Sequence, residues 1–199
     1  MALRSKFGVV VLTAVGVLAL VGLYTVGAYN TLIRLDQQVQ SQWAQVENAY
    51  QRRSDLVPNL VETVKGAANF EKSAYLAVAE ARSQVGQATA APNDPAQFAK
   101  FQQAQDGLSS ALSRLMVVVE RYPDLNATEN FRDLQVQLEG TENRITVERM
   151  RFNEAAQAFN SRRDSFPTNL VANLSSARFQ EKSYFKAQPQ AETAPQVKF

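Results

Sequence analysis

Apolar residues recur at steps of three and four along most of the chain, which is the spacing of one face of an α-helix. The clearest run lies between residues 95 and 122, where these steps continue without interruption. Its members are Phe98, Phe101, Gln105, Leu108, Leu112, Leu115, Val119 and Tyr122. The run predicts a long amphipathic helix that places Leu112 and Leu115 in a core.

Three other long helices follow from the same spacing. The first is expected from about Thr31 to Asp55, ending at Leu56-Val57-Pro58 because proline removes a backbone donor and restricts the residue before it. The second is expected to start at Pro58 and to fade into residues 86–94, which have the composition of a loop. The last carries a seven-residue repeat from Phe131 to Phe159 and ends near Pro167.

Helix caps separate these elements. Asp94 precedes Pro95 and Gln97, a combination typical of a helix start, and a second cap is expected between Asn126 and Glu129. After Pro167, residues 169–174 suit one or two turns of helix. The tail from Lys186 is rich in Ala, Gln and Pro and is expected to be extended or disordered.

The fold class predicted is therefore all-α: a single N-terminal transmembrane helix followed by an antiparallel, up-down bundle of four long helices. The expected organisation is a cytoplasmic N-terminus at residues 1–6, a membrane helix at 7–29, a helical bundle at 30–175 and a flexible C-terminal tail at 176–199.

The membrane helix is predicted from a stretch without charge. No charged residue occurs from Phe7 to Ile33, and the apolar part to Tyr29 is about 35 Å long as a helix, enough to cross the hydrocarbon core. Arg4 and Lys6 precede it, so the positive-inside rule places the N-terminus in the cytoplasm and the bundle outside, in the periplasm of a two-membrane bacterium. The alternative is a cleaved signal peptide, with small residues at 26–28 as the cleavage site, but the apolar run exceeds the usual signal core.

Composition narrows the chemistry. The sequence contains no His and no Cys, which removes the commonest general base, the usual zinc ligands and both Ser-His and Cys-His catalysis. With 21 basic and 19 acidic residues interspersed, the chain shows no basic face typical of nucleic-acid binding. We therefore expect no enzyme, no catalytic, metal or cofactor site, no small-molecule substrate and no nucleic-acid partner.

Three charged residues, Arg82, Glu148 and Arg162, fall on the apolar stripes. They either meet in a buried charged layer, or extend their charged ends to water at the margin of the bundle. The second interpretation is favoured.

The residues that punctuate the helices resemble those of the LemA family. The resemblance extends from about residue 29 to the C-terminus, and its motifs occur in the family's order. They are Tyr29 to Leu32, Trp43, Arg52 to Gly66, Ala111 to Leu115, Tyr122 to Leu125, Glu129 to Phe131, Thr141 to Ile145, Phe166 to Val171, and Val197 to Phe199. The sequence departs from the family at Ala67-Ala68-Asn69, where an aromatic residue and a His are common.

The resemblance implies a bacterial membrane protein with one N-terminal span and a bundle of long helices, and it implies no reaction. We therefore expect a non-catalytic scaffold or adaptor of the cytoplasmic membrane, which assembles protein partners or further copies of itself. The alternative is an envelope-stress or protease-linked regulator. In that case Val197 and Phe199, two apolar residues beside the terminal carboxylate, would enter the peptide groove of a PDZ-type partner.

Overall fold

The computed structural model describes residues 2–66, 71–88 and 91–186, without the side chains of residues 2–7, 9 and 10. Its helices are α1 (Ala2–Lys65), α2 (Lys72–Gln87), α3 (Pro95–Val119), α4 (Pro123–Asn126), α5 (Glu129–Asp164) and α6 (Thr168–Leu174). No strand occurs in these described ranges. The all-α class is thus confirmed, as are the long third helix, the last long helix and the short helix after Pro167.

One helix, α1, joins the predicted membrane segment, the predicted first helix and the start of the predicted second helix, whose remainder is α2. It runs without a break from Ala2 to Lys65 and includes Pro58, so the predicted stop at Leu56-Val57-Pro58 was wrong. Proline at position 58 cannot donate to the carbonyl oxygen of Ser54. That oxygen instead accepts a hydrogen bond of 3.1 Å from Nε of Arg82 on α2. The tertiary contact supplies the missing partner, and the helix continues to Lys65, one residue before Gly66.

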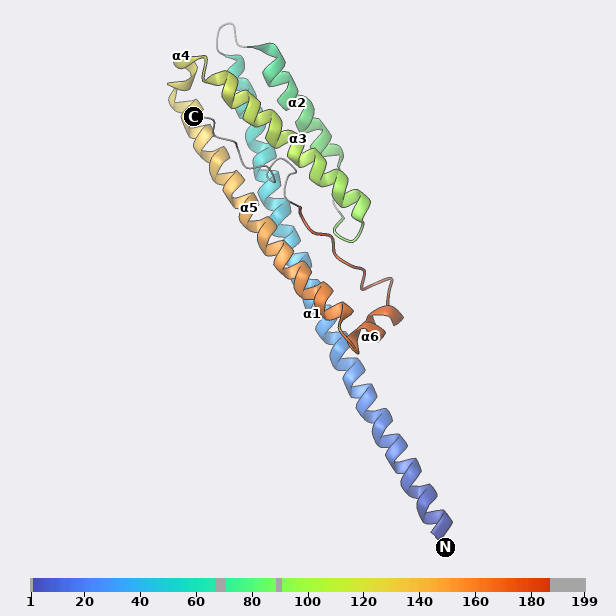
Figure 1. The fold of residues 1–199 in the computed structure, drawn as a ribbon. Coiled ribbons are helices and arrows are strands. Elements are labelled where there is room, and N and C mark those ends of the chain that lie inside the picture. The colour runs from blue at the N-terminus through green and yellow to red at the C-terminus, as the bar shows by residue number, and fades with distance from the viewer. Residues whose placement is uncertain (1, 67–70, 89–90, 187–199) are drawn as a thin grey trace, which may run out of the picture.

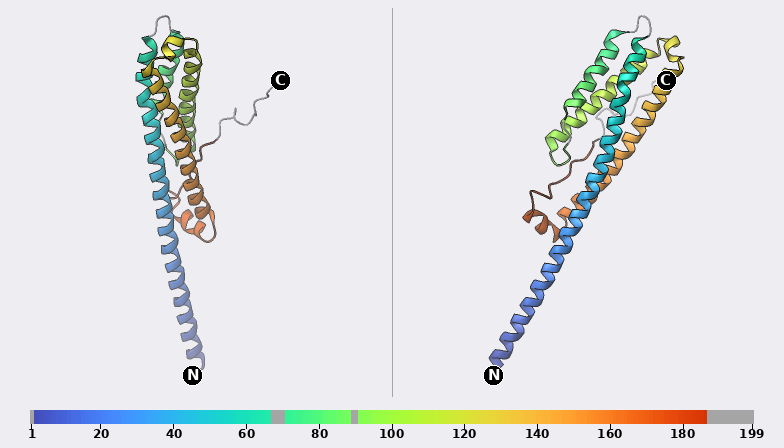
Figure 2. Two further views of the ribbon diagram at one scale, coloured as in Figure 1. Left: turned by 90° about the vertical axis from the view of Figure 1, so that its left-hand side faces the viewer. Right: turned by 180° about the vertical axis from the view of Figure 1, so that it is seen from behind.

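The long helices alternate in direction. α5 lies antiparallel beside α1, and α2 and α3 form an antiparallel hairpin next to that pair (Figure 1). The hairpin accompanies only the half of the α1–α5 pair that is remote from the N-terminus (Figure 2). We call this the distal half, and the end of the molecule beyond it the distal tip. The antiparallel, up-down bundle of four long helices remains a prediction.

Two apolar cores fill the interior. The distal core is mainly aliphatic and contains Leu112 and Leu115, both buried as predicted. The second core lies nearer to the N-terminus and is mainly aromatic. It includes Trp43, Tyr50, Phe98, Phe101, Phe152, Phe159, Phe179 and Phe185.

Residues 175–186 form a segment, here called the strap, which begins with a turn at 175–178, is extended from residue 180 and crosses the aromatic core. Phe179 packs edge-on against Tyr29 with ring centroids 5.3 Å apart, and Phe185 lies 4.8 Å from Phe98. The tail expected from residue 176 is therefore packed against the helices as far as Lys186. The side chains of Phe179 and Phe185 complete a core that the helices leave open.

Side-chain amides hold the backbone of the strap. Asn160 donates to the carbonyl of Lys182 and accepts from its N–H, both at 2.9 Å. Asn153 makes the same two bonds with Phe185, at 3.0 and 2.9 Å. Asn153 and Asn160 are seven residues apart on α5, and their partners Lys182 and Phe185 are three residues apart in the strap. Both spacings are about 10 Å, so the two amides match the backbone of the strap.

An ion pair fixes the middle of the strap. Nζ of Lys182 lies 2.6 Å from a carboxylate oxygen of Asp36 on α1, and both residues are buried. The same ammonium donates to the side chain of Asn93 at 2.8 Å. The strap is thereby joined to α1 and to the loop before α3.

Candidate functional site

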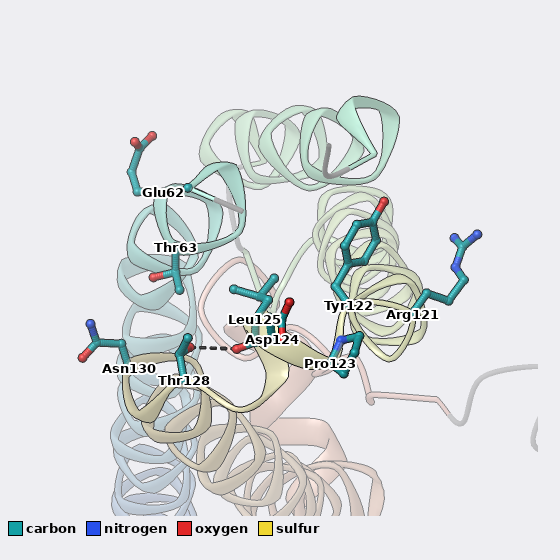
Figure 3. Close-up of a pocket in the computed structure, with 10 residues that line it drawn as sticks. Glu62, Thr63, Arg121, Tyr122, Pro123, Asp124, Leu125, Thr128 and Asn130 are labelled. Carbon is teal, nitrogen blue, oxygen red and sulfur yellow. Dashed lines mark hydrogen bonds between the residues drawn. The ribbon is translucent and has the colours of Figure 1, made fainter. Parts of the chain in front are cut away.

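A hollow of about 680 Å³ opens at the distal tip (Figure 3). It lies between the end of α1, the short helix α4 and the start of α5. Its walls include residues from three of the family-like motifs, which are far apart in sequence. The lining residues are Glu62, Thr63, Gly66, Arg121, Tyr122, Pro123, Asp124, Leu125, Thr128 and Asn130.

Local structure explains how these residues converge. Proline at position 123 stands in the first turn of α4, where its missing N–H costs nothing. Leu125 is buried and joins the distal core. The hydroxyl of Thr128 donates to the carbonyl of Leu125 at 2.8 Å, as Figure 3 shows, and also accepts from N–H of Phe131 as the cap of α5. The turn that forms the wall of the hollow is thus tied to the core beneath it.

Charged side chains lie at and beside the rim and form pairs. Nζ of Lys65 lies 2.8 Å from Glu62, and this hydrogen bond raises the pKa of the ammonium above its ordinary value. Arg121 pairs with Glu71 at 2.9 Å across the start of α2. An apolar floor and a rim of both charge signs, open to solvent, suit contact with another protein.

No group of three or more carboxylates in the described part of the chain is arranged to hold a metal ion. The side chains of the hollow supply carboxylates, hydroxyls, an amide and a guanidinium.

A buried arginine that sequence analysis missed lies between the two cores. Arg53 is only 1 % exposed, and its guanidinium pairs with Glu142 of α5 at 2.8 Å. It also donates to the hydroxyl of Ser109 and to both the carbonyl and the side chain of Gln105 on α3. The group therefore ties α1, α3 and α5 together.

The predicted helix stop at Leu56-Val57-Pro58 placed Arg53 near a helix end, but α1 does not end there. A signal was nevertheless present in the sequence. Arg53 continues the helical spacing of Val46, Tyr50 and Val57, and Gln105 is the polar member of the stripe on the third helix. Two polar residues on facing apolar stripes indicate a buried pair.

The three charged residues expected on the stripes do not form a common layer. Arg82 reaches Ser54, as described above. Glu148 is buried and lies 3.3 Å from Arg151 and 3.8 Å from Arg144, both on its own helix. The favoured interpretation, side chains at the margin, holds for Arg82, whereas Glu148 is an internal carboxylate with its partners at the surface.

The residues expected to bind a partner through the C-terminus, Val197 and Phe199, lie outside the described residues. The site that the structure does show is the tip hollow, which sequence analysis had marked only by the motifs that line it.

Comparison with known proteins decides the family. The model of the LemA family matches residues 42–199. The chain belongs to the LemA family. The match includes all residues that line the tip hollow of this LemA-family chain and the whole strap.

Named relatives are more distant. The chain is 27% identical over 184 residues to magnetosome protein MamQ 2 of Paramagnetospirillum magneticum. The aligned region covers 83% of this chain and 67% of the relative. Protein LemA of Metamycoplasma hominis is 24% identical over 147 residues, covering 74% of this chain and 64% of that protein. Neither name denotes an enzyme.

Proposed function

We propose that this LemA-family chain is a non-catalytic scaffold anchored in the bacterial cytoplasmic membrane, which presents its distal tip to a protein partner. The observation that carries the proposal is the continuity of α1, in which the apolar segment and the first helix of the soluble part are one helix. A continuous helix transmits position and orientation, whereas a flexible linker would not.

The geometry supports a spacer. From residue 30 to Lys65, α1 extends about 55 Å at the rise of an α-helix. α5 lies beside it over most of this length (Figure 1), and Arg53 links both helices to α3. The tip hollow is thereby held at a fixed height above the apolar segment, which is what an adaptor requires if its partner is itself bound to the membrane.

The non-catalytic part of the proposal is supported by the residues available. The whole sequence has no His and no Cys, and two charged residues of the hollow, Glu62 and Arg121, are engaged in ion pairs at its rim. The extracytoplasmic placement of the soluble part is supported by Arg4 and Lys6 before the apolar segment.

The test is site-specific photocrosslinking in cells. A benzophenone amino acid at Asp124, in the hollow, should give a discrete protein adduct. The matched control is the same amino acid at Glu154, an exposed residue of α5 remote from the tip. Identical adducts at both positions, or none at Asp124, would contradict a partner site at the tip.

The alternative role, a regulator whose C-terminal tail is read by a PDZ-type partner, makes a separate prediction. Phe199→Asp should abolish capture of that partner, because its pocket would receive a charge in place of a ring. The thermal unfolding of the chain should stay unchanged. Equal capture by the natural and altered tails would remove the alternative and leave the tip site unaffected.

A further inference from the structure

The short helix α6 packs on the apolar part of α1. The hydroxyl of Thr168, which is fully buried, lies 3.1 Å from the hydroxyl of Tyr24. Val171 and Ala172 are also buried. A groove runs between the two helices and is lined by Leu20, Val21 and Tyr24 of α1 and by Leu170, Val171 and Leu174 on the α6 side.

Large apolar side chains are exposed on this element, beside the exposed amide of Asn173. Leu170 is 60 % exposed, Leu174 88 % and Phe166, in the loop before the helix, 80 %. Large apolar side chains gathered in this way on a soluble surface mark an interaction site. The patch is continuous with the exposed apolar surface of α1, because Leu20 and Val21 line the same groove and are themselves more than half exposed.

The position of α6 along α1 indicates whether α6 is surrounded by water or by lipid. Its contacts on α1 fall four to nine residues before Tyr29, the end of the apolar run. They are therefore about 6–14 Å inside that end at the rise of an α-helix. Helices that lie in a membrane interface bury their apolar face to about 5–10 Å. If residues 7–29 cross a bilayer, α6 therefore lies at the depth of the bilayer and not in the water above it.

We propose that α6 and Phe166 are immersed in the leaflet on the side of the soluble part, with their apolar side chains against lipid acyl chains. The element is then a second membrane contact, which fixes the rotation and tilt of α1. A basic residue, the exposed Arg178, follows α6 and reaches the headgroups in this placement. Arg163, which precedes α6, instead donates to the carbonyl of Phe179 and pairs with Asp164. The proposal is independent of which side of the membrane carries the soluble part.

The natural absence of Cys permits a direct test with the full chain in vesicles of phosphatidylcholine and phosphatidylglycerol. Single variants Leu174→Cys and Phe166→Cys are labelled with an environment-sensitive fluorophore. Both positions are exposed, so the label should not disturb the fold. The control for a watery site is Val136→Cys, at an exposed apolar residue of α5 near the tip, and the control for a lipid site is Leu12→Cys on α1.

We expect the labels at Leu174 and Phe166 to emit at shorter wavelength than the label at Val136. Lipids that carry a doxyl group on the part of the acyl chain near the headgroup should quench the labels at Leu174 and Phe166 several-fold more strongly than the label at Val136. Aqueous iodide should quench them several-fold less than the label at Val136. Quenching by iodide at the level of the Val136 label would overturn the proposal. Protection from both quenchers would also overturn it, because the patch would then be covered by protein, such as a second copy of the chain. Neither outcome bears on the tip site, whose test is crosslinking at Asp124.

Discussion

The two cores of the molecule are enclosed in different ways. The distal core is surrounded by α1, α2, α3 and α5 and is filled largely by Val and Leu. The aromatic core has only α1 and α5 along its length, with the start of α3 at one end and Ala172 of the short α6 also in contact, and the strap supplies the remaining wall. Two helices cannot enclose an apolar interior, whereas four can. The difference shows that large aromatic side chains, together with an extended segment of the chain, can enclose a core where a second pair of helices is missing.

The difference extends to hydrogen bonding. Helices satisfy their own backbone groups, so the distal core needs no polar side chains for its walls. An extended segment has no internal partners, and the strap therefore takes them from Asn153 and Asn160. Buried amides in the aromatic half are thus a consequence of its architecture.

The largest effect is expected from removing the aromatic side chain with which the strap fills its core. Phe185 touches the rings of Trp43, Phe98 and Phe152, and Arg149 lies over its face. Phe185→Ala should cost about 3–5 kcal/mol of unfolding free energy, the usual range for a buried Phe. Denaturant unfolding in detergent measures it, with the exposed Glu181→Ala as control. Equal stability of the two variants would mean that the strap is not part of the core.

A similar change in the distal core should separate the two halves. Leu112→Ala should cost about 2–5 kcal/mol because the side chain is buried among other aliphatic residues. Trp43 is the sole tryptophan of the sequence and lies in the aromatic core. The emission spectrum of Trp43 should therefore change in Phe185→Ala. In the folded Leu112→Ala variant it should equal the spectrum of the natural chain. The same spectral change in both variants would show that the cores are not distinct.

Arg53 tests whether the halves unfold together. Arg53→Met keeps the length of the side chain and leaves Glu142 and Gln105 without their partner. Glu142 is partly exposed and can recover water, so the cost should be about 2–3 kcal/mol, below the range for a fully buried pair. Trp43 fluorescence and helical circular dichroism should then report different midpoints. A single shared midpoint would mean that packing alone couples the halves.

The smallest effect concerns the start of α3, which carries Phe98 into the aromatic core. The N–H of Gln97, and then that of Ala96, donate to the Asp94 carboxylate and hold its pKa below its ordinary 3.8. The cap therefore contributes stability above that pH and loses it as the pH falls through the lowered value. Asp94→Asn keeps an oxygen for the cap and does not titrate. The melting temperatures of the natural chain and this variant should differ slightly at neutral pH, and this difference should change as the pH falls below 3.8. A constant difference would contradict the assignment.

The sequence was informative where structure is local. The stripe from Phe98 to Val119 and the cap at Asp94 predicted α3 because periodicity and capping depend on neighbours along the chain. The continuation of α1 through Pro58 was missed because it depends on Arg82, a partner from another helix. The strap was missed for a related reason: Phe179 and Phe185 have no helical or strand spacing to identify them. The tip hollow was marked by family-like motifs, but only the fold brings those motifs together.

The position of the strap in the chain also sets an order of assembly. Ribosomes make residues 175–186 after the helices described above, so the distal core can form from segments that are already complete. The aromatic half must wait with Trp43 and Phe152 uncovered until Phe185 arrives. During that interval the rings of Trp43 and Phe152 lack the cover that Phe185 gives them, and the nascent chain closes this surface with its own later segment.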